Sequence, residues 1–246
     1  MKKFRADLHI HTLLSPCADL EMTPRNIVTK ARNCNLDIIG ITDHNSTRNA
    51  KLVKKLGEQA GIFTLAGAEV TTREEVHCLA FFEFPEELLL FQQFIDEHIS
   101  RIPNKEGYFG YQPVIDEDEN ILELVPYYLP SALNAGISKI QQRVEELNGL
   151  FIPAHVDRPA NGLFSHLGFI PPGLKFDALD ISEHVSEKYV LEQYVIQYKT
   201  TLIRNSDAHY LKQIGEIYTV FGMSKISFTE IRMALNRQDN RFCELV

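Results

Sequence analysis

The sequence predicts an α/β fold in which strands and helices alternate and a mostly parallel sheet curls into a barrel. Three observations support this prediction. Short apolar runs of strand length alternate with amphipathic stretches of helical length. Several of the apolar runs lead into a histidine or an acid. The chain has 246 residues, a common length for a single α/β barrel. We therefore expect one domain over residues 1–246.

The first third of the chain contains the clearest elements. Residues 4–10 predict a strand, and Thr23 followed by Pro24 supplies an N-cap and a favourable first helical residue. Residues 36–42 form a near-continuous apolar run, as expected of a strand buried on both faces. A second helix, ended by Gly61, and two further strands are expected at 46–60, 62–70 and 76–82.

The alternation breaks after residue 85. Residues 85–100 predict a helix, but residues 101–130 do not have the pattern of a barrel segment. Two apolar runs flank residues 116–120, whose sequence DEDEN predicts the acidic tip of a hairpin. We therefore expect an insertion over about 86–136, which acts as a lid, as a surface for a protein partner, or as a solvated ornament.

The alternation resumes after this insertion. The expected helices are 137–147 and a last helix from Thr229, and the expected strands are 150–154, 176–181, 201–205 and 217–221.

Histidines and acids gather in five short stretches, each expected at the C-terminal end of a strand. In the first stretch Asp7, His9 and His11 are spaced i, i+2, so an extended strand places all three on one face. Asp207 and His209 repeat this spacing. Six of the nine histidines fall in the five stretches, which are 7–11, 42–44, 69–77, 154–158 and 206–209. Because imidazoles and carboxylates converging from strand ends are ligands for divalent metals, the pattern predicts a multinuclear metal site.

The net charge and the composition of the chain limit the functions that it can have. The net charge is −8 and no run is rich in Lys or Arg. This argues against tight binding of long nucleic acid, but not of a nucleotide or short oligonucleotide held by metals. The four cysteines are far apart, so neither a zinc knuckle nor a disulfide framework is indicated. Since neither a signal-peptide core nor a bilayer-spanning run is visible, we expect no membrane association and a cytoplasmic location.

Several motifs occur in a fixed order along the chain. They are DLHIHT at 7–12, GITDHN at 40–45, Glu69, His77, His155 and SDAH at 206–209. Together they resemble the PHP superfamily, whose name stands for polymerase and histidinol phosphatase. The resemblance runs from residue 4 to about residue 221, interrupted by the insertion. It implies a distorted (β/α)7 barrel with two or three divalent metals at the strand ends, and it implies a phosphoesterase.

The resemblance also implies which residues bind the metals. They form three overlapping sets: His9, His11, Glu69 and Asp207 for one metal; Glu69, His77 and His155 for a second; His44 and His209 for a third. Ligation rich in imidazole suits Zn, Mn or Fe better than Mg.

The third metal site departs from the family pattern. Relatives place a further His or Asp in the loop after the first strand, where this chain has Ser-Pro-Cys-Ala-Asp at 15–19. Cys17 lies nearest the expected position, and Asp19 is the alternative. A thiolate ligand would favour zinc or iron over magnesium there.

Other polar residues near the motifs are candidates for catalysis. Arg158 could clamp a phosphate and stabilise developing charge, or it could pair with a neighbouring acid on the surface. His184 or Glu183 could protonate a leaving group, although a loop histidine is more often merely exposed. Asp7 and Asp43 are expected to orient imidazoles.

These observations predict a metal-dependent phosphoesterase that uses metal-activated hydroxide on a small phosphorylated substrate, such as a nucleotide, a short oligonucleotide or a similar phosphomonoester. Two alternatives stay open. The first is a metal-dependent amide or lactone hydrolase. In such enzymes a carboxylated lysine usually bridges the metals, whereas the residue expected to bridge them here is Glu69. A metal-binding sensory or scaffold module without turnover would dock a protein partner through the insertion.

Overall fold

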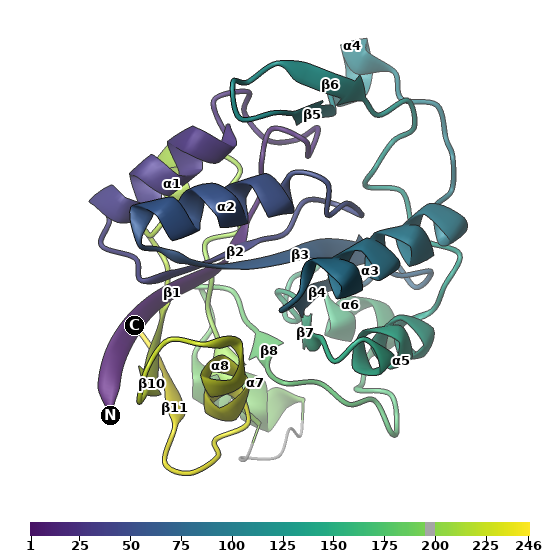
Figure 1. Cartoon of the computed structure of the whole chain (residues 1–246). Helices are drawn as coiled ribbons and strands as arrows, with labels where there is room; N and C mark the ends of the chain where they lie inside the picture. Colours follow the sequence, from purple (N-terminus) through teal and green to yellow (C-terminus); the bar gives the residue numbers. More distant parts are fainter. Residues whose placement is uncertain (195–199) are drawn as a thin grey trace.

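The computed structural model describes residues 1–194 and 200–246. Its main feature is a seven-stranded sheet with the order β11-β10-β1-β2-β3-β4-β7 (Figure 1). These strands are β1 (Lys2–Ile10), β2 (Ile38–Ile41), β3 (Phe63–Thr71), β4 (His77–Phe82), β7 (Leu150–Pro153), β10 (Thr219–Met223) and β11 (Phe242–Leu245). The helices are α1 (Pro24–Asn33), α2 (Ala50–Ala60), α3 (Pro85–His98), α4 (Glu106–Phe109), α5 (Ile137–Glu146), α6 (Leu163–Leu167), α7 (Glu187–Gln193) and α8 (Phe228–Leu235), with a short 3₁₀ helix at Leu211–Gln213.

The centre of the sheet is parallel and its flanks are antiparallel. β1, β2 and β3 run parallel, as the sequence predicts. β4 runs antiparallel to β3 and to β7, and β10 runs antiparallel to β1. The turn at 72–76 is too short for the crossover that parallel neighbours need, so β3 and β4 form a hairpin. The α/β class is confirmed, and the sheet departs from a mostly parallel arrangement at its two flanks.

A second, two-stranded sheet lies beside β7 and β11, the two edge strands of the main sheet. Its parallel strands are β8 (Leu179–Asp180) and β9 (Leu202–Ile203). The backbone N–H of Val156, just after β7, donates to the carbonyl of Asp180 at 2.9 Å. The N–H of Ala208, beyond β9, donates to the carbonyl of His9 in β1 at 3.0 Å. The two sheets together bring the ends of β7, β8 and β9 to the same edge as the end of β1.

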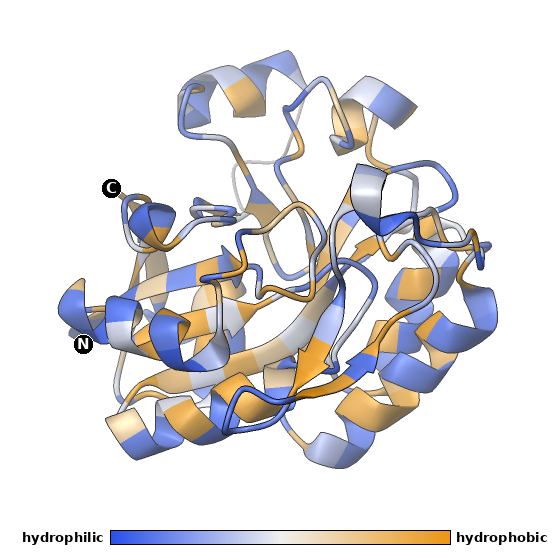
Figure 2. Ribbon diagram, turned by 90° about the horizontal axis from the view of Figure 1, so that it is seen from above, coloured by the Kyte–Doolittle hydropathy of each residue, from blue (hydrophilic) through white to orange (hydrophobic). Residues whose placement is uncertain are grey.

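Each face of the curled sheet has its own apolar core. Ile38 and Ile39 follow one another in β2 and therefore point to opposite faces. Ile39 belongs to the larger core, with Val53 of α2, whereas Ile38 packs in the smaller core with Ile231 of α8. Figure 1 accordingly shows α2 on one side of the sheet and α8 on the other. Figure 2 shows apolar strands beside helices in which hydrophobic and hydrophilic residues alternate around the axis.

Local signals predict several element boundaries correctly. The Thr23 hydroxyl caps α1 by accepting a hydrogen bond from the N–H of Asn26 at 3.3 Å. Gly61 ends α2 in the left-handed conformation, with φ of 76°. The second helix begins at Ala50 instead of at residue 46, because residues 46–49 form the loop that leaves the site. The short elements α4, α6, α7 and β11 have weak sequence signals and were not predicted.

The region expected as an insertion contains one core helix and one hairpin. α3 buries Phe91 and Ile95 against the larger core. The predicted hairpin is confirmed, with β5 (Pro113–Ile115) paired to β6 (Ile121–Leu124) around the acidic tip. It lies beyond the ends of β1 and β2, at the top of Figure 1. Over residues 1–194 and 200–246, no helix is long and apolar enough to span a membrane.

Candidate metal centre

The parallel strands deliver the first ligand candidates to one edge of the sheet. The i, i+2 spacing works as predicted: Asp7, His9 and His11 are all completely buried at the end of β1. His44 follows β2, and Glu69 lies near the end of β3 and is 1% exposed. These side chains meet because the ends of parallel strands lie together.

His77 reaches the same edge by another route. The sequence predicts a ligand at the C-terminal end of each strand, and for His77 this is wrong: it is the first residue of β4. Because β4 runs antiparallel to β3, its beginning lies beside the end of β3, with His77 opposite Thr71. The hairpin therefore places His77 beside Glu69.

Two more candidates follow β7 and β9 in unusual backbone conformations. His155 has φ of 30° and Asp207 has φ of 51°, both in the left-handed region that side chains other than glycine seldom adopt. Such conformations cost about 1–3 kcal/mol and are concentrated at functional sites. At both positions the resulting side chain points to Glu69 or to the histidines of β1.

Glu69 is the centre of the site. Its Oε1 lies 2.9 Å from His77 Nδ1, 3.1 Å from His155 Nε2 and 3.3 Å from His9 Nε2. Its Oε2 lies 3.1 Å from His44 Nδ1 and 3.4 Å from His11 Nε2.

Asp207 closes the cluster from the β9 side. Its Oδ1 is 3.3 Å from the Nε2 atoms of both His9 and His11. Its other oxygen, Oδ2, is 2.5 Å from Arg158 Nη1. Asp207 is thus shared between the histidines of β1 and the guanidinium of Arg158.

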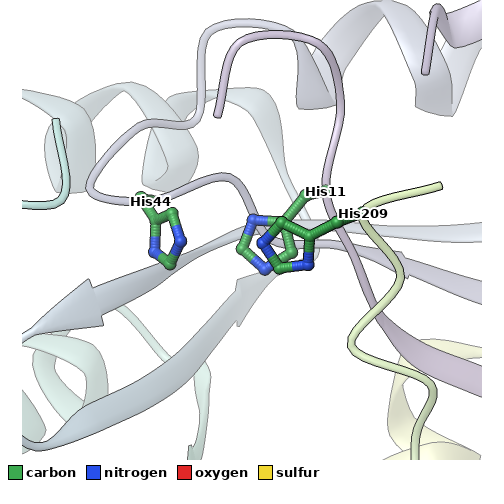
Figure 3. A group of neighbouring side chains, drawn as sticks. All are labelled: His11, His44 and His209. Carbon is green, nitrogen blue, oxygen red and sulfur yellow. The ribbon is translucent and has the colours of Figure 1, made fainter. Parts of the chain in front are cut away.

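The donor atoms form three overlapping groups, each compact enough to surround one ion. They are His9, His11, Glu69 and Asp207; His44, Glu69 and His77; and His11, His44 and His209. Figure 3 shows the last group, in which the rings of His11 and His209 stack with centroids 4.2 Å apart.

The sets expected from the family resemblance correspond to these groups in part. The first set coincides with the first group. In the second, His44 takes the place expected for His155, although His155 still contacts Glu69. Cys17 is outside all three groups; the residue is exposed overall, but its thiol lies against His44 and His209.

The geometry fits metal ions better than it fits a network of hydrogen bonds. Within the cluster, as far as the structure describes the chain, Glu69 Oε2 and His44 Nδ1 are buried without a hydrogen-bond partner. Glu69 Oε2 and His44 Nδ1 are 3.1 Å apart, which is the distance of an ion pair. Buried polar atoms are rarely left in this state, and convergent imidazole and carboxylate donors are the ordinary environment of a divalent cation.

The charges in the cluster perturb one another strongly. Burial acts to raise the pKa of Glu69, but the charges of His77 and His9 outweigh it and hold this pKa well below its usual value. Burial also acts to lower the pKa of His44, but Cys17 and Glu69 raise it to about 10. For Cys17, burial opposes ionisation, yet His209 and His44 lower its pKa to about 6.

Three buried carboxylates support the loops around the site. Asp7 accepts hydrogen bonds from the N–H groups of Ser206 and Gly215, at 3.0 and 3.1 Å. It therefore fixes the loop that carries Asp207, whereas the sequence predicted that it would orient an imidazole ring. Burial raises the pKa of Asp7 to about 6 despite these bonds. Asp180, which sequence reasoning missed, accepts from the N–H of His155 at 3.3 Å. The signal available in the sequence was the position of Asp180 near the end of the predicted strand at 176–181.

Asp43, like Asp7, makes no direct contact with an imidazole. It accepts hydrogen bonds from Thr12 and from Ser15, which in turn contacts His11 Nδ1 at 2.9 Å.

A cleft of about 690 Å³ opens beside the cluster. Arg158 and His184 both line it, but they differ in their surroundings. The Arg158 side chain is 41% exposed and anchored by Asp207, whereas that of His184 is 83% exposed and 3.4 Å from Glu183. His209 and Tyr210 also line the cleft.

The chain belongs to the PHP domain family, whose model matches residues 7–156. It is 33% identical over 116 residues to the uncharacterized protein YqxK of Bacillus subtilis, covering 42% of this chain and 27% of that protein. It is 36% identical over 78 residues to the uncharacterized protein MJ1587 of Methanocaldococcus jannaschii, covering 28% and 46%. The matches thus span less than half the length of either relative.

Solved structures share the fold at low sequence identity. The lesion-specific endonuclease PfuEndoQ of Pyrococcus furiosus has a TM-score of 0.77 and 18% identity, with 98% of this chain and 58% of that chain covered. A protein from Bifidobacterium adolescentis, suggested to be a metal-dependent phosphoesterase, has a TM-score of 0.60 and 19% identity, with 95% and 96% covered.

Proposed function

We propose that this PHP domain is a metal-dependent phosphoesterase. The observation that carries the proposal is the convergence of buried imidazole and carboxylate donor atoms on Glu69, beside a cleft that contains an arginine. Both parts are needed, because phosphoryl transfer requires stabilisation of negative charge and a space for the ester.

The donor set specifies the kind of cofactor. We propose His9, His11, His44, Glu69, His77, His155, Asp207 and His209 as ligands of two or three divalent ions, with Cys17 beside the third. Imidazole-rich ligation favours Zn, Mn or Fe. When bound, such ions lower the pKa of a water molecule and neutralise charge on phosphoryl oxygens.

Arg158 is proposed to bind the phosphoryl group. One of its nitrogens, Nη1, is taken by Asp207, and the partly exposed remainder of the guanidinium lies in the cleft. A planar guanidinium keeps its charge and matches the geometry of a phosphate. The same ion pair would hold Asp207 Oδ1 toward His9 and His11 while substrate binds.

His184 and Glu183 are proposed to act at the leaving group. Both line the cleft, so either could supply a proton there. Their high exposure leaves both side chains free to adjust, which predicts a smaller contribution than that of Arg158.

Incision of DNA at a lesion is a second candidate. The favouring observation is the fold shared with endonuclease Q, which has been solved with a 27-mer duplex carrying an abasic lesion at the active site. That likeness has a TM-score of 0.74 and covers 98% of this chain. The net charge of −8 opposes the candidate, because duplex binding depends on neutralising phosphates. A small phosphate ester or short oligonucleotide is therefore the favoured substrate.

A panel of substrates with added Mn²⁺ tests the proposal. It contains mononucleotides, nucleoside 3′,5′-bisphosphates, short oligonucleotides, histidinol phosphate, and duplex DNA with and without an abasic site. We expect release of phosphate from a small ester, loss of this activity in Glu69→Gln, and its retention in the matched control His98→Ala. Incision of only the abasic duplex would select the second candidate.

Three other outcomes would contradict the proposed metal-dependent phosphoesterase. Full activity in a chelated, metal-free sample would exclude the metal mechanism. Tightly bound metal without turnover of any ester would favour the sensory or scaffold module, and turnover of amides or lactones alone would favour that hydrolase class.

A further inference from the structure

A chain of buried hydrogen bonds connects the β5–β6 hairpin to His11. Its members are Asn49, Thr12, Asp43 and Ser15, and all four are completely buried or 1% exposed. They come from two separate segments, which are the loop after β1 and the loop between β2 and α2. Such a network is costly unless every polar atom is satisfied.

At the site end, the network determines which nitrogen of His11 carries the proton. Ser15 Oγ lies 2.7 Å from Asp43 Oδ1, 2.9 Å from His11 Nδ1 and 3.2 Å from the backbone N of His44. A carboxylate only accepts, so the one hydroxyl proton of Ser15 goes to Asp43. Ser15 then accepts from the N–H of His44 and from His11 Nδ1–H. The lone pair of His11 is left on Nε2, which faces Glu69 and Asp207.

Thr12 connects Asp43 to the hairpin side. Its backbone N–H and its hydroxyl donate to the two oxygens of Asp43, both at 2.7 Å. Its hydroxyl oxygen accepts from the N–H of Leu14 and from Asn49 Nδ2, both at 3.1 Å. The hydroxyl therefore uses its one donor and both acceptor positions.

Asn49 joins this network to the hairpin backbone. It occupies the N-cap position of α2, where an asparagine ordinarily accepts a hydrogen bond from the first turn, but its side chain makes no such bond. Instead Nδ2 donates to the carbonyl of Pro113 at 3.2 Å, and Oδ1 accepts from the N–H of Ile115 at 3.3 Å. Both partners belong to β5.

The insertion has a second connection, beside His44. Asn45 Nδ2 donates to the carbonyls of Leu129 and Ser131, at 2.7 and 2.9 Å. Asn45 Oδ1 accepts from the N–H of Thr71 at 3.0 Å, and Asn45 has φ of 45°. The loop between β2 and α2, which contains His44, is therefore hydrogen-bonded to the same insertion at two points, Asn45 and Asn49.

We propose that the β5–β6 hairpin is a positioning element of the metal centre, acting on His11 through Asn49, Thr12, Asp43 and Ser15. This inference rests on the proposed metal site. The hairpin is neither a movable lid nor an ornament, because its backbone completes the network that fixes the tautomer and orientation of a ligand. Thr12, Ser15 and Asn49 are positioning residues, since none of them faces the cleft.

Paired substitutions at Thr12 test the network. Thr12→Val removes the hydroxyl at nearly constant volume, and Thr12→Ser retains it. Thr64→Val is the matched control, since Thr64 is equally buried in β3 and its hydroxyl has no hydrogen-bond partner. The readouts are the Kd for Mn²⁺ from titration of the metal-free full chain, the absorption spectrum with Co²⁺, and Tm. We expect Thr12→Val to weaken Mn²⁺ binding about 10- to 100-fold and to alter the Co²⁺ spectrum, with near-normal values in Thr12→Ser.

A second pair of variants tests the hairpin. Asn49→Ala, and replacement of residues 113–124 by a short Gly-Ser linker, are each expected to weaken Mn²⁺ binding. Since both changes break the same connection, their combined effect on Kd should equal that of the more severe single change and not the product of the two.

Unchanged Kd and Co²⁺ spectra in Thr12→Val and in the hairpin replacement, with both proteins folded, would overturn the proposal. So would multiplicative effects of Asn49→Ala and the replacement. Metal binding is measured without any substrate, so failure of the proposed phosphoesterase activity would leave this test intact. Absence of metal binding in the wild-type chain would instead reject the site on which the inference rests.

Discussion

The two walls of the site differ in how they hold their polar residues. On the β1–β2–β3 wall, His11, Asp43 and Glu69 are at most 1% exposed and lie among fixed partners. On the β7–β9 wall, Arg158 is 41% exposed and His184 is 83% exposed, and both face an open cleft. The β1–β2–β3 wall thus holds most of the proposed ligands among fixed partners, whereas the β7–β9 wall combines two proposed ligands, His155 and Asp207, with exposed side chains that face the cleft.

The physical reason lies in the cost of burial. A polar group taken out of water must find partners, and a group that finds them becomes rigid. Metal binding benefits from this rigidity because its geometry is demanding, whereas binding of an ester benefits from side chains that can adjust. Substitutions on the two walls should therefore have different effects, which the following predictions address in order of decreasing size.

The largest effect is expected on the buried wall. His9→Ala removes a nitrogen that lies 3.3 Å from both Glu69 and Asp207, so it should abolish metal-dependent phosphate release. This loss of activity should be larger than the factor of about 10 to 100 that substitutions outside the ligand set usually cause. Metal content measured by mass spectrometry should fall in parallel. Normal metal content and turnover in this variant would remove His9 from the ligands.

On the open wall, Arg158→Ala should lower kcat/KM by about 10²- to 10³-fold, as expected for loss of a charged donor. Arg158→Lys should recover only part of this activity, because lysine keeps the positive charge but lacks the planar guanidinium with its paired N–H donors. Titration with Mn²⁺ distinguishes a role of Arg158 in binding phosphate from a role in fixing Asp207. If Arg158 only fixed Asp207, the metal Kd would weaken while KM stayed unchanged, and the proposed phosphate contact would be wrong.

Metal affinity should increase with pH, because protons compete for the ligands. With its pKa raised to about 10, His44 is protonated in the metal-free protein at neutral pH. Its contribution to folding stability is complete below pH 6.5, the ordinary value, and is lost as pH rises toward 10. Release of this proton should strengthen Mn²⁺ binding about tenfold per pH unit between pH 7 and 9. Calorimetry in buffers of different ionisation enthalpy counts the protons, and none released would contradict the assignment.

Cys17 should influence which metal is preferred more than whether metal binds. Its thiol lies against His44 and His209, and a thiolate favours zinc over manganese. Cys17→Asp should therefore shift the ratio of Zn²⁺ to Mn²⁺ affinity toward Mn²⁺ by roughly tenfold at one site. Competition titrations measure this ratio, with Cys34→Ala as the control. An unchanged ratio would leave Asp19 as the remaining candidate.

The smallest effect is expected for His184, since an exposed side chain can be replaced by water as a proton source. His184→Ala should lower kcat less than about threefold at neutral pH, with a larger loss for poor leaving groups. A series of esters with different leaving-group pKa values checks this. A loss as large as that of Arg158→Ala would show that the open wall is more rigidly organised than its exposure indicates.

The sequence alone was sufficient for the local features of this protein. Spacing of i, i+2 placed His9 and His11 together, and the capping signals at Thr23 and Gly61 set helix ends, because these features depend only on nearby backbone geometry. The resemblance carried by the motifs predicted the family, which the match over residues 7–156 confirms. The ligand roles remain predictions that the geometry supports.

Tertiary structure decided everything that depends on strand direction and on distant partners. His77 reaches Glu69 because β4 turns back, and no periodicity in the sequence records which way a strand pairs. Asn49 resembled an ordinary residue of a predicted helix, yet its side chain bonds to Thr12 and Pro113, 37 and 64 residues away. Hydrogen bonds between segments form only once the core has fixed their separation, so the sequence supplied the ligands and the fold determined what holds them in place.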